Sequence, residues 1–496
     1  MIETDVLIVG FGPTGATLAA LLGQAGIKTL VVERDREIYR YPRAAHFDHE
    51  IMRIWQKIGI EQAVLPHTRE MYEYEFRNAV GEILIRFDQR GVAAPSGWAP
   101  SYMFHQPALE EALRARVAEH PSVEVRLGAS MLTIERNDAD GVTAWISDGK
   151  VGSEGIQARF LIGADGGGSL VRRQIDAALF DYGFDEPWLV IDTVVQHEDS
   201  LPPFGVQVCD PKRPTTVMPM APLRRRWEFM LKPDETPEEM LDDARIARLL
   251  EPWVKPGQAE VVRKAVYRFH GLVAKTWRNA SVLLAGDAAH QMPPFMGQGM
   301  CSGIRDADNL AWKLVAVLRG HASPRLLDTY QAEREPHVRH IIEAAIAMGR
   351  VVCIQDEGAA AMRDQGMKAA RAGMDDKAKP LPGLPGITTG CLAKSKRAGE
   401  LFPQATRACT STGLPGRFDD LAGAGFWLIT RNDMDVPTHD GIRHIALSRD
   451  IADESGRLDA WLEAIGAEAV LVRPDRYVFG TGTPAALIAE LNVALG

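Results

Sequence analysis

Cysteine is scarce in this sequence, and no two cysteines form a Cys-x-x-Cys pair. The 496 residues contain 5 cysteines, at positions 209, 301, 353, 391 and 409. Without a closely spaced pair, the sequence encodes neither a zinc knuckle nor a thioredoxin-type dithiol. The odd count and the wide spacing are typical of reduced thiols, so we expect a cytoplasmic protein.

An excess of positive charge and a long apolar run are also missing. Lys and Arg total 56 against 66 Asp and Glu, which gives a formal net charge of −10. This balance excludes the basic surface that binds nucleic acids and the polybasic segments that bind anionic membranes. The longest uncharged apolar run, near residues 11–27, contains Gly and Pro and is short for a membrane span. The start of the chain is acidic, where a signal peptide would be basic. We therefore expect no nucleic acid partner and no membrane partner.

The chain begins with a strand–helix–strand unit. Its elements are a β-branched strand, an apolar helix and a second strand, at residues 4–9, 16–25 and 29–32. In the first connection, Gly10 permits a tight turn, Gly12 lets the backbone approach a pyrophosphate, and Gly15 lets helix and strand pack closely. Glu33 ends the second strand and suits a ribose diol. The unit predicts a dinucleotide site without distinguishing NAD from FAD, and the alternative is a Gly-rich turn in another α/β sheet.

Two further apolar strands end at an acidic residue and a Gly-rich turn. One ends at Asp165-Gly166 and the other at Gly286-Asp287. After the second, a loop over residues 293–299 leads into a helix expected over 300–318. Free N–H groups at the start of that helix, together with its dipole, would stabilise negative charge on a bound group. The alternative is an ordinary N-capped core helix.

Together with Tyr41-Pro-Arg43 and His-Gln106-Pro, these motifs resemble the group A flavoprotein monooxygenases, the para-hydroxybenzoate hydroxylase-like family of FAD-dependent aromatic hydroxylases. The stretch Arg225-Arg-Trp-Glu-Phe-Met230 is similar to the 3-(3-hydroxyphenyl)propionate hydroxylase subfamily. The resemblance implies FAD as cofactor, NADH (with NADPH as the alternative) as co-substrate, and O₂ and a phenolic small molecule as substrates. The cofactor-binding residues that it implies are Gly10, Gly12, Gly15, Glu33, Arg34, Arg43, Gln106, Asp165, Asp287, Pro294, Gly297, Gln298, Gly299 and Met300.

The candidate catalytic residues are His46, Asp48 and Pro293. His46 and Asp48 follow the flavin-contacting motif directly and are expected beside the substrate. The alternatives are a metal site built on His46 and His49, which has no partner motif, and an exposed first turn of a helix that ends near Gly59. We expect no metal.

Other polar and aromatic residues have simpler interpretations. The run 224–226, three arginines, is interpreted as a solvated strand start, with a phosphate- or carboxylate-binding patch as the alternative. We expect His290 to hydrogen bond structurally, and Glu333 and Arg334 to form a satisfied ion pair. The tryptophans at 55, 227 and 312 are expected in the core.

The predicted fold is a mixed α/β architecture. It comprises a Rossmann-like FAD-binding domain (1–180 and 276–372) and an inserted substrate-binding β-sheet domain (181–275). A linker (373–397) leads to a C-terminal thioredoxin-like α/β domain (398–496) without a Cys-x-x-Cys pair. A hairpin region is expected around 70–105, inside the first domain. The C-terminal domain is expected to support stability or assembly, and a homodimer is one assembly compatible with the sequence.

The leading functional hypothesis is a single-component monooxygenase that hydroxylates a phenol ortho to its hydroxyl group. The resemblance implies that NAD(P)H reduces FAD and that O₂ forms a flavin C4a-hydroperoxide, which the ring then attacks. A 3-(3-hydroxyphenyl)propionate-like acid is the expected substrate type. The alternatives are a flavin monooxygenase of polycyclic polyketides or other phenols, and a catalytically silent flavin-binding protein.

Overall fold

The computed structural model describes residues 1–149, 152–198, 201–372 and 383–496. A sheet with parallel central strands underlies the N-terminal part of the chain. Its strands are β1 (Ile2–Val9), β2 (Thr29–Glu33), β8 (Val123–Leu127), β9 (Ser130–Asp138), β10 (Gly141–Ser147), β11 (Glu154–Gly163), β17 (Arg278–Asn279) and β18 (Val282–Leu284). The order is β17-β18-β11-β1-β2-β8, with β10 and β9 branching from β11. Because β1 pairs in parallel on both sides and is buried, its second half is a continuous apolar run.

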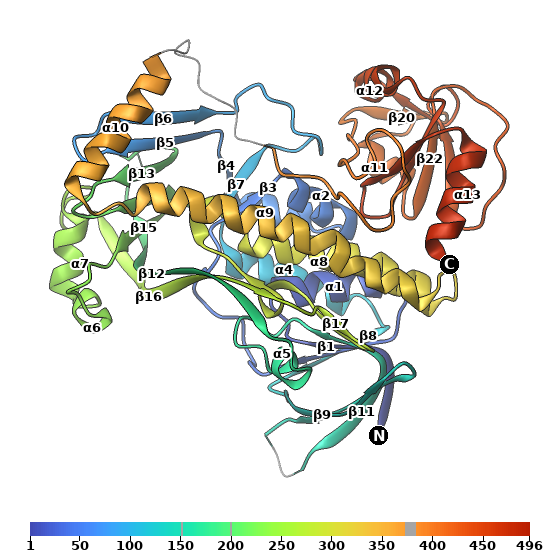
Figure 1. Ribbon diagram of the computed structural model, residues 1–496, viewed down its shortest axis with the longest axis horizontal. Coiled ribbons are helices and arrows are strands. Elements are labelled where there is room, and N and C mark those ends of the chain that lie inside the picture. Colours follow the sequence, from blue (N-terminus) through green and yellow to red (C-terminus); the bar gives the residue numbers. More distant parts are fainter. Residues whose placement is uncertain (150–151, 199–200, 373–382) are drawn as a thin grey trace.

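Helices surround this sheet and hold its loops. Helix α1 (Pro13–Gln24) packs against α8 (Gly299–Leu318) and α4 (Gln106–Ala118). Helix α9 (Asp328–Val352) is the longest, and it crosses the middle of the molecule in Figure 1. The other helices of this part are α2 (His49–Ile58), α3 (Glu61–Val64), η1 (Leu65–His67), α5 (Leu170–Gln174), η2 (Gly286–Ala288), η3 (Pro294–Met296), η4 (Pro324–Leu327) and α10 (Glu357–Ala372).

A second sheet lies beside the first. Its strands are β5 (Glu73–Asn78), β6 (Ile83–Asp88), β12 (Leu179–Val195), β13 (Gly205–Cys209), β14 (Thr215–Pro219), β15 (Arg224–Met230), β16 (Ala259–Ala274) and β19 (His290–Gln291), in the order β19-β16-β12-β15-β14-β13-β5-β6. Helices α6 (Pro237–Met240) and α7 (Asp243–Leu250) cover one face through a shared apolar cluster. The opposite face packs against η3 and α9. A small third sheet has the order β3 (His46–Asp48), β7 (Ser101–Phe104) and β4 (Thr68–Glu70).

The hairpin expected inside the first domain belongs to this second sheet. Strand β5 pairs in parallel with β13, so residues 73–88 extend the sheet edge. The sequence predicted a hairpin region here but not the sheet that it joins, because its partner strand β13 lies far away in the chain. The predicted domain boundaries stay predictions, and residues 373–382 of the predicted linker lie outside the described residues.

The C-terminal part is a small α/β unit, as expected. Its elements are β20 (Ala408–Thr410), β21 (Pro415–Gly416), α11 (Phe418–Ala422), β22 (Phe426–Thr430), β23 (Ile442–Ala446), β24 (Ile451–Asp453), α12 (Arg457–Ile465), β25 (Ala469–Val472), β26 (Val478–Gly482) and α13 (Pro484–Leu495). The main sheet has the order β23-β22-β25-β26. Strand β26, which contains two glycines, was not predicted. None of the helices in the described ranges is both long enough and apolar enough to cross a membrane.

Candidate active site

The Gly-rich connection between β1 and α1 has the geometry that its sequence predicts. Gly10 has a φ of +105°, and a Cβ there would lie 2.3 Å from the carbonyl oxygen of Ala164. A Cβ on Gly15 would lie 2.1 Å from the carbonyl oxygen of Gly10. A Cβ on Gly12 would meet nothing within 4 Å. Gly10 and Gly15 therefore serve close packing, whereas Gly12 borders open space at the N-terminus of α1, where a pyrophosphate fits.

Glu33 lies beside this connection at the end of β2. One carboxylate oxygen accepts a hydrogen bond from the backbone N–H of Phe11 at 2.7 Å, and the other accepts one from Asp35 at 2.9 Å. The neighbouring Arg34 is exposed, with its Nε 3.8 Å from a carboxylate oxygen of Asp35. Glu33 is thus held next to the Gly-rich loop, whereas Arg34 points to solvent.

Asp165 and Arg172 organise the second loop. The carboxylate of Asp165 accepts hydrogen bonds from the Ser169 hydroxyl and from the backbone N–H of Leu170 at 2.7 Å, so it caps α5. The Arg172 guanidinium donates to the carbonyl oxygens of Gly167 at 2.7 Å and Ala288 at 2.9 Å. Arg172 therefore ties the loop after β11 to the loop after β18.

Asp287 differs from the other acidic residues of these loops. Its side chain is exposed to solvent although protein surrounds it closely, and this environment raises the pKa of the carboxyl group. Among the described residues it has no hydrogen bond or ion pair. The neighbouring Gly286 N–H is held at 3.1 Å by Asp306, which also bonds His290 at 2.6 Å. The protein thus positions the backbone here and leaves the Asp287 carboxylate free for a ligand.

The third loop ends at an uncapped helix. Gly297 adopts a left-handed conformation with a φ of +62°, and α8 begins after Gln298 without a side-chain hydrogen bond to its first N–H groups. The Gln298 side chain instead accepts a hydrogen bond from Arg305 at 3.0 Å. Pro293 is buried before η3, and Pro294 and Met300 are partly accessible. The free N–H groups at the start of α8 are therefore available to an electron-rich ligand.

His46 is bonded to this loop. Its Nδ1 lies 3.1 Å from the carbonyl oxygen of Gly297, and its Nε2 lies 2.7 Å from the hydroxyl oxygen of Ser101. Since a carbonyl oxygen only accepts, Nδ1 carries the proton in this arrangement and the neutral ring accepts at Nε2. Burial lowers the pKa of His46, which favours the neutral form.

Asp48 is fully engaged by the protein. One of its oxygens accepts from the backbone N–H of Glu50 at 3.0 Å and so caps α2, and the other accepts from Arg305 at 2.6 Å. The ion pair with Arg305 holds the pKa of Asp48 well below its usual range. Helix α2 ends at Gly59 as predicted, but its first turn is not exposed.

The metal interpretation of this region has no support in the described part of the chain, where no cluster of metal-ligating side chains is found.

Gln106 fixes the backbone that follows β2. Its side-chain oxygen accepts hydrogen bonds from the N–H groups of Arg43 at 2.9 Å and Ala44 at 2.7 Å. From the other side, Arg226 of the second sheet donates to the carbonyl oxygens of Pro42 and Arg43 at 2.7 and 2.9 Å. This backbone is therefore clamped between the start of α4 and the second sheet, with the Arg43 side chain exposed.

The arginine run 224–226 is not a solvated strand start, and that prediction was wrong. Arg225 and Arg226 are 1% and 3% exposed, because β15 lies in the middle of its sheet. Arg226 forms an ion pair with Asp192 at 2.7 Å, and Arg263 binds the other oxygen of Asp192 at 3.0 Å. These charges compensate one another within the sheet.

Glu228, a residue that the sequence analysis missed, lies on the same face of β15 as Arg226. Protein surrounds the carboxylate and raises its pKa, yet the side chain keeps 12% of its surface accessible. Its nearest cationic partner is Arg226 at 3.9 Å, and among the described residues it has no hydrogen bond. Strand alternation from Arg226 could have revealed this position.

An aromatic cluster marks where this face meets the loop before α8. The ring of Phe295, from the loop before α8, lies 5.8 Å from that of Trp188 on β12 and 5.9 Å from that of Phe184. Trp188 and Glu228 share a sheet face, because Glu228 pairs with Val190, two positions along β12 from Trp188. The Glu228 carboxylate therefore lies between the clamped Pro42–Arg43 backbone and the Phe295 loop.

Comparison with known proteins identifies this arrangement. The family described as "FAD binding domain" matches residues 3–345, and the "HcaD C-terminal domain" matches residues 437–494. The chain belongs to the FAD-binding group A flavoprotein monooxygenases, a family of aromatic hydroxylases. The residues described above fit FAD: Gly12 leaves room for the pyrophosphate, and Asp287 and the start of α8 offer unused polar groups.

Two relatives and two solved structures show the extent of the similarity. A probable NADH-specific resorcinol 4-hydroxylase of Rhodococcus jostii (strain RHA1) is 40% identical, over 98% of this chain and 93% of the relative. A 3-(3-hydroxy-phenyl)propionate/3-hydroxycinnamic acid hydroxylase of Mycolicibacterium smegmatis (strain ATCC 700084 / mc(2)155) is 35% identical, over 99% and 92%. The complex of aklavinone-11 hydroxylase with FAD and aklavinone has a TM-score of 0.79 at 24% identity, covering 100% and 99% of the two chains. OxyS anhydrotetracycline hydroxylase of Streptomyces rimosus has a TM-score of 0.77 at 26% identity, covering 100% and 98%.

Proposed function

We propose that this flavoprotein uses NADH and O₂ to hydroxylate a single-ring phenol, with a second substituent meta to the hydroxyl group, and yields a catechol. Both relatives named above carry such a ring in their names, resorcinol in one and 3-hydroxyphenylpropionate in the other. FAD, when bound and reduced, supplies the oxygen-activating chemistry. The chain's own residues bind and orient the ring and control its proton.

The observation that carries the proposal is the carboxylate of Glu228, which contacts Arg226 only at 3.9 Å and has no hydrogen bond among the described residues. A free phenol has a pKa near ~10, so little phenolate exists at neutral pH. A carboxylate that accepts the hydroxyl hydrogen bond, or takes its proton, raises the electron density of the ring ortho to that oxygen. His46 and Asp48 have their polar atoms bonded to the protein, so we assign them to positioning and Glu228 to the phenol.

Three features of the site support this assignment. Burial, and to a lesser extent the charge of Glu228, raises the pKa of Tyr74, so its hydroxyl group stays protonated and can donate a hydrogen bond. The ring of Tyr74 lies over Gly205, where a Cβ would come within 2.4 Å of it. Phe295, which is partly accessible and packs on the buried Trp188, provides aromatic surface on this side of the sheet. An aromatic ring with one or two hydroxyl groups matches this mixture of apolar and acceptor groups.

Steady-state oxidation of NADH with a panel of phenols tests the proposal. The panel contains resorcinol, 3-(3-hydroxyphenyl)propionate and a polycyclic phenol, each measured with the parent, Glu228→Gln and the matched control Glu260→Gln. Glu260 lies on the same sheet but is exposed. We expect the single-ring phenols to stimulate the parent, and Glu228→Gln to lower kcat/KM at least about tenfold. A preference for the polycyclic phenol, or an unchanged Glu228→Gln, would contradict the assignment.

A further inference from the structure

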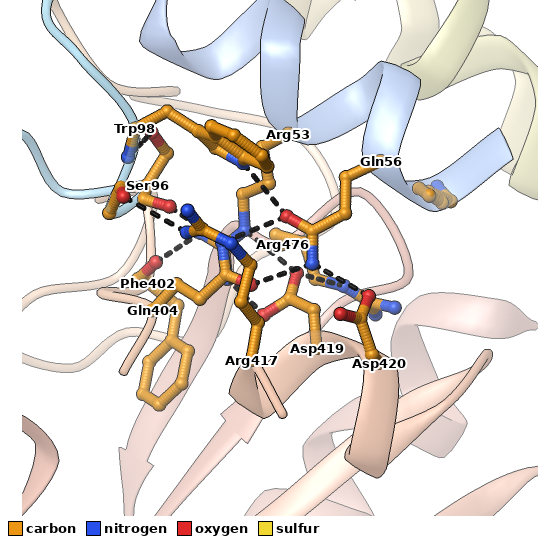
Figure 2. A network of polar contacts seen from close by, with 12 residues as sticks. Arg53, Gln56, Ser96, Trp98, Phe402, Gln404, Arg417, Asp419, Asp420 and Arg476 are labelled. Atoms are coloured by element: carbon orange, nitrogen blue, oxygen red, sulfur yellow. Dashed lines mark hydrogen bonds and ion pairs between the residues drawn. The ribbon is translucent and has the colours of Figure 1, made fainter. Parts of the chain in front are cut away.

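Helix α2 connects the flavin site to the C-terminal domain. It begins directly after His46 and Asp48, and its polar residues Glu50, Arg53 and Gln56 are buried. In Figure 2, Arg53 and Gln56 extend from this helix to residues of the C-terminal domain. Arg53 binds Asp419 through two hydrogen bonds of 2.8 Å. These contacts dock the domain on α2, but they do not lead to the flavin site.

A second set of contacts does lead there. The hydroxyl group of Tyr477, just before β26, donates a hydrogen bond to one carboxylate oxygen of Glu50 at 2.7 Å. The other Glu50 oxygen accepts from Nε of Arg305 on α8 at 2.6 Å. The three side chains are 5%, 6% and 2% exposed, so water does not compete strongly for these bonds.

The two terminal nitrogens of Arg305 donate hydrogen bonds near the N-terminal end of α8. One terminal nitrogen binds Asp48 at 2.6 Å, and the other binds the Gln298 side chain at 3.0 Å. Gln298 is the residue from which α8 starts, and it follows Gly297, to which His46 is bonded. The orientation of Arg305 therefore fixes the loop whose N–H groups face the cofactor.

We propose that the C-terminal domain shapes the FAD site through Tyr477, which orients Glu50 and, through it, Arg305 and the start of α8. Tyr477 is then a positioning residue for the cofactor, acting from a different domain. If the domain only docks on α2, the loss of any single hydrogen bond across this interface should affect FAD binding equally. The two possibilities differ in what a single interface hydrogen bond does to FAD.

The test compares Tyr477→Phe with the control Asp420→Ala. Each variant removes one hydrogen bond across the interface; Asp420 accepts from Gln56 at 2.7 Å, away from Arg305. FAD affinity is measured by titrating the apoprotein, and the visible spectrum of the bound flavin is recorded. We expect Tyr477→Phe to weaken FAD binding by about twofold to thirtyfold and to shift the flavin absorption bands, with Asp420→Ala unchanged in both.

Two results would overturn the proposal. One is a Tyr477→Phe protein with the FAD affinity and spectrum of the parent. The other is an equal loss in both variants, which would reflect general loosening of the interface. Melting of the apoproteins monitors folding. If Tyr477→Phe is not obtained in folded form, Glu50→Gln, which weakens the same chain of bonds, carries the same expectation and the same contrary outcome.

Discussion

Asp287 and His46, two residues of the proposed flavin site, use their polar atoms in opposite ways. Asp287 has no hydrogen-bond partner in the described ranges, and the surrounding protein raises its pKa. His46 has a partner for each ring nitrogen. A carboxylate that is open to solvent and not used by the protein can accept hydrogen bonds from a ligand. We therefore assign Asp287 to ligand binding and His46 to holding the loop at Gly297.

Replacing Asp287 with alanine should separate cofactor binding from stability. A hydrogen bond to a charged group contributes about 1.5–3 kcal/mol, so FAD affinity should fall roughly tenfold or more. The apoprotein should be as stable as the parent, because no protein partner is lost. Isothermal titration with FAD and thermal melting of the apoprotein measure the two quantities. An unchanged affinity for FAD would remove Asp287 from the site.

His46 should make the protein sensitive to acid. Its folded-state pKa is lowered below the ordinary value of 6.5 by burial, so the unfolded chain binds a proton more readily. The stability that neutral His46 contributes is then present above about pH 6.5 and is lost as the pH falls below it. Urea unfolding from about pH 8 to about pH 5 should show the parent's advantage over His46→Gln shrinking with acidity. A difference that stays constant with pH would contradict this.

The β1–α1 unit is the element that the sequence predicted best. Its spacing predicted the strand, the helix, the tight turn at Gly10 and the close packing at Gly15, because these are local properties of the chain. The arginines of β15 show where local patterns fail. Their charges predict a solvated strand, yet β15 lies between two neighbouring strands and buries Arg225 and Arg226. Compensation by Asp192 comes from another strand and is invisible in the local sequence.

Two glycine substitutions in this element should differ in what they change: one lowers the stability of the apoprotein, and the other weakens FAD binding. Gly15→Ala places a Cβ 2.1 Å from a backbone oxygen, so we expect the apoprotein to lose about 1–3 kcal/mol of unfolding free energy. Gly12 has a φ of −72° and open space beside it, so Gly12→Ala should change that free energy by less than about 0.5 kcal/mol while weakening FAD binding. Chemical denaturation and FAD titration test the pair. Equal destabilisation of both apoproteins would contradict the interpretation.

At the scale of the whole molecule, the sequence predicted three parts but not how they meet. The polar residues Glu50, Arg53 and Gln56 recur at a spacing that resembles a solvated helix face. Instead, the C-terminal domain covers them and supplies their partners, Tyr477 and Asp419 among them. Glu333 and Arg334 likewise form ion pairs, but with Arg473 and Asp306 rather than with each other. Such long-range pairing leaves no periodic signal.

The buried ion pair between Arg53 and Asp419 should matter for the stability of the whole chain. Asp419 also contacts Arg476 at 3.3 Å, so Asp419→Ala leaves two buried guanidinium groups without their carboxylate. We expect a loss of about 3–5 kcal/mol. The control Asp433→Ala, which removes an exposed pair with Arg449, should cost less than about 1 kcal/mol. Denaturant unfolding measures the free energy of unfolding of both variants. Similar losses would show that the buried Arg53–Asp419 pair contributes no more to stability than an exposed pair.

We infer that this protein inserts an atom of molecular oxygen into a phenol. The most direct measurement is the reaction of the FAD-loaded enzyme with NADH, ¹⁸O₂ and resorcinol or 3-(3-hydroxyphenyl)propionate, followed by mass spectrometry of the product. We expect one labelled oxygen in a new ring hydroxyl group, ortho to the original one, and NADH oxidation that depends on the phenol. An unlabelled product, or NADH oxidation that is indifferent to every phenol tested, would contradict the account.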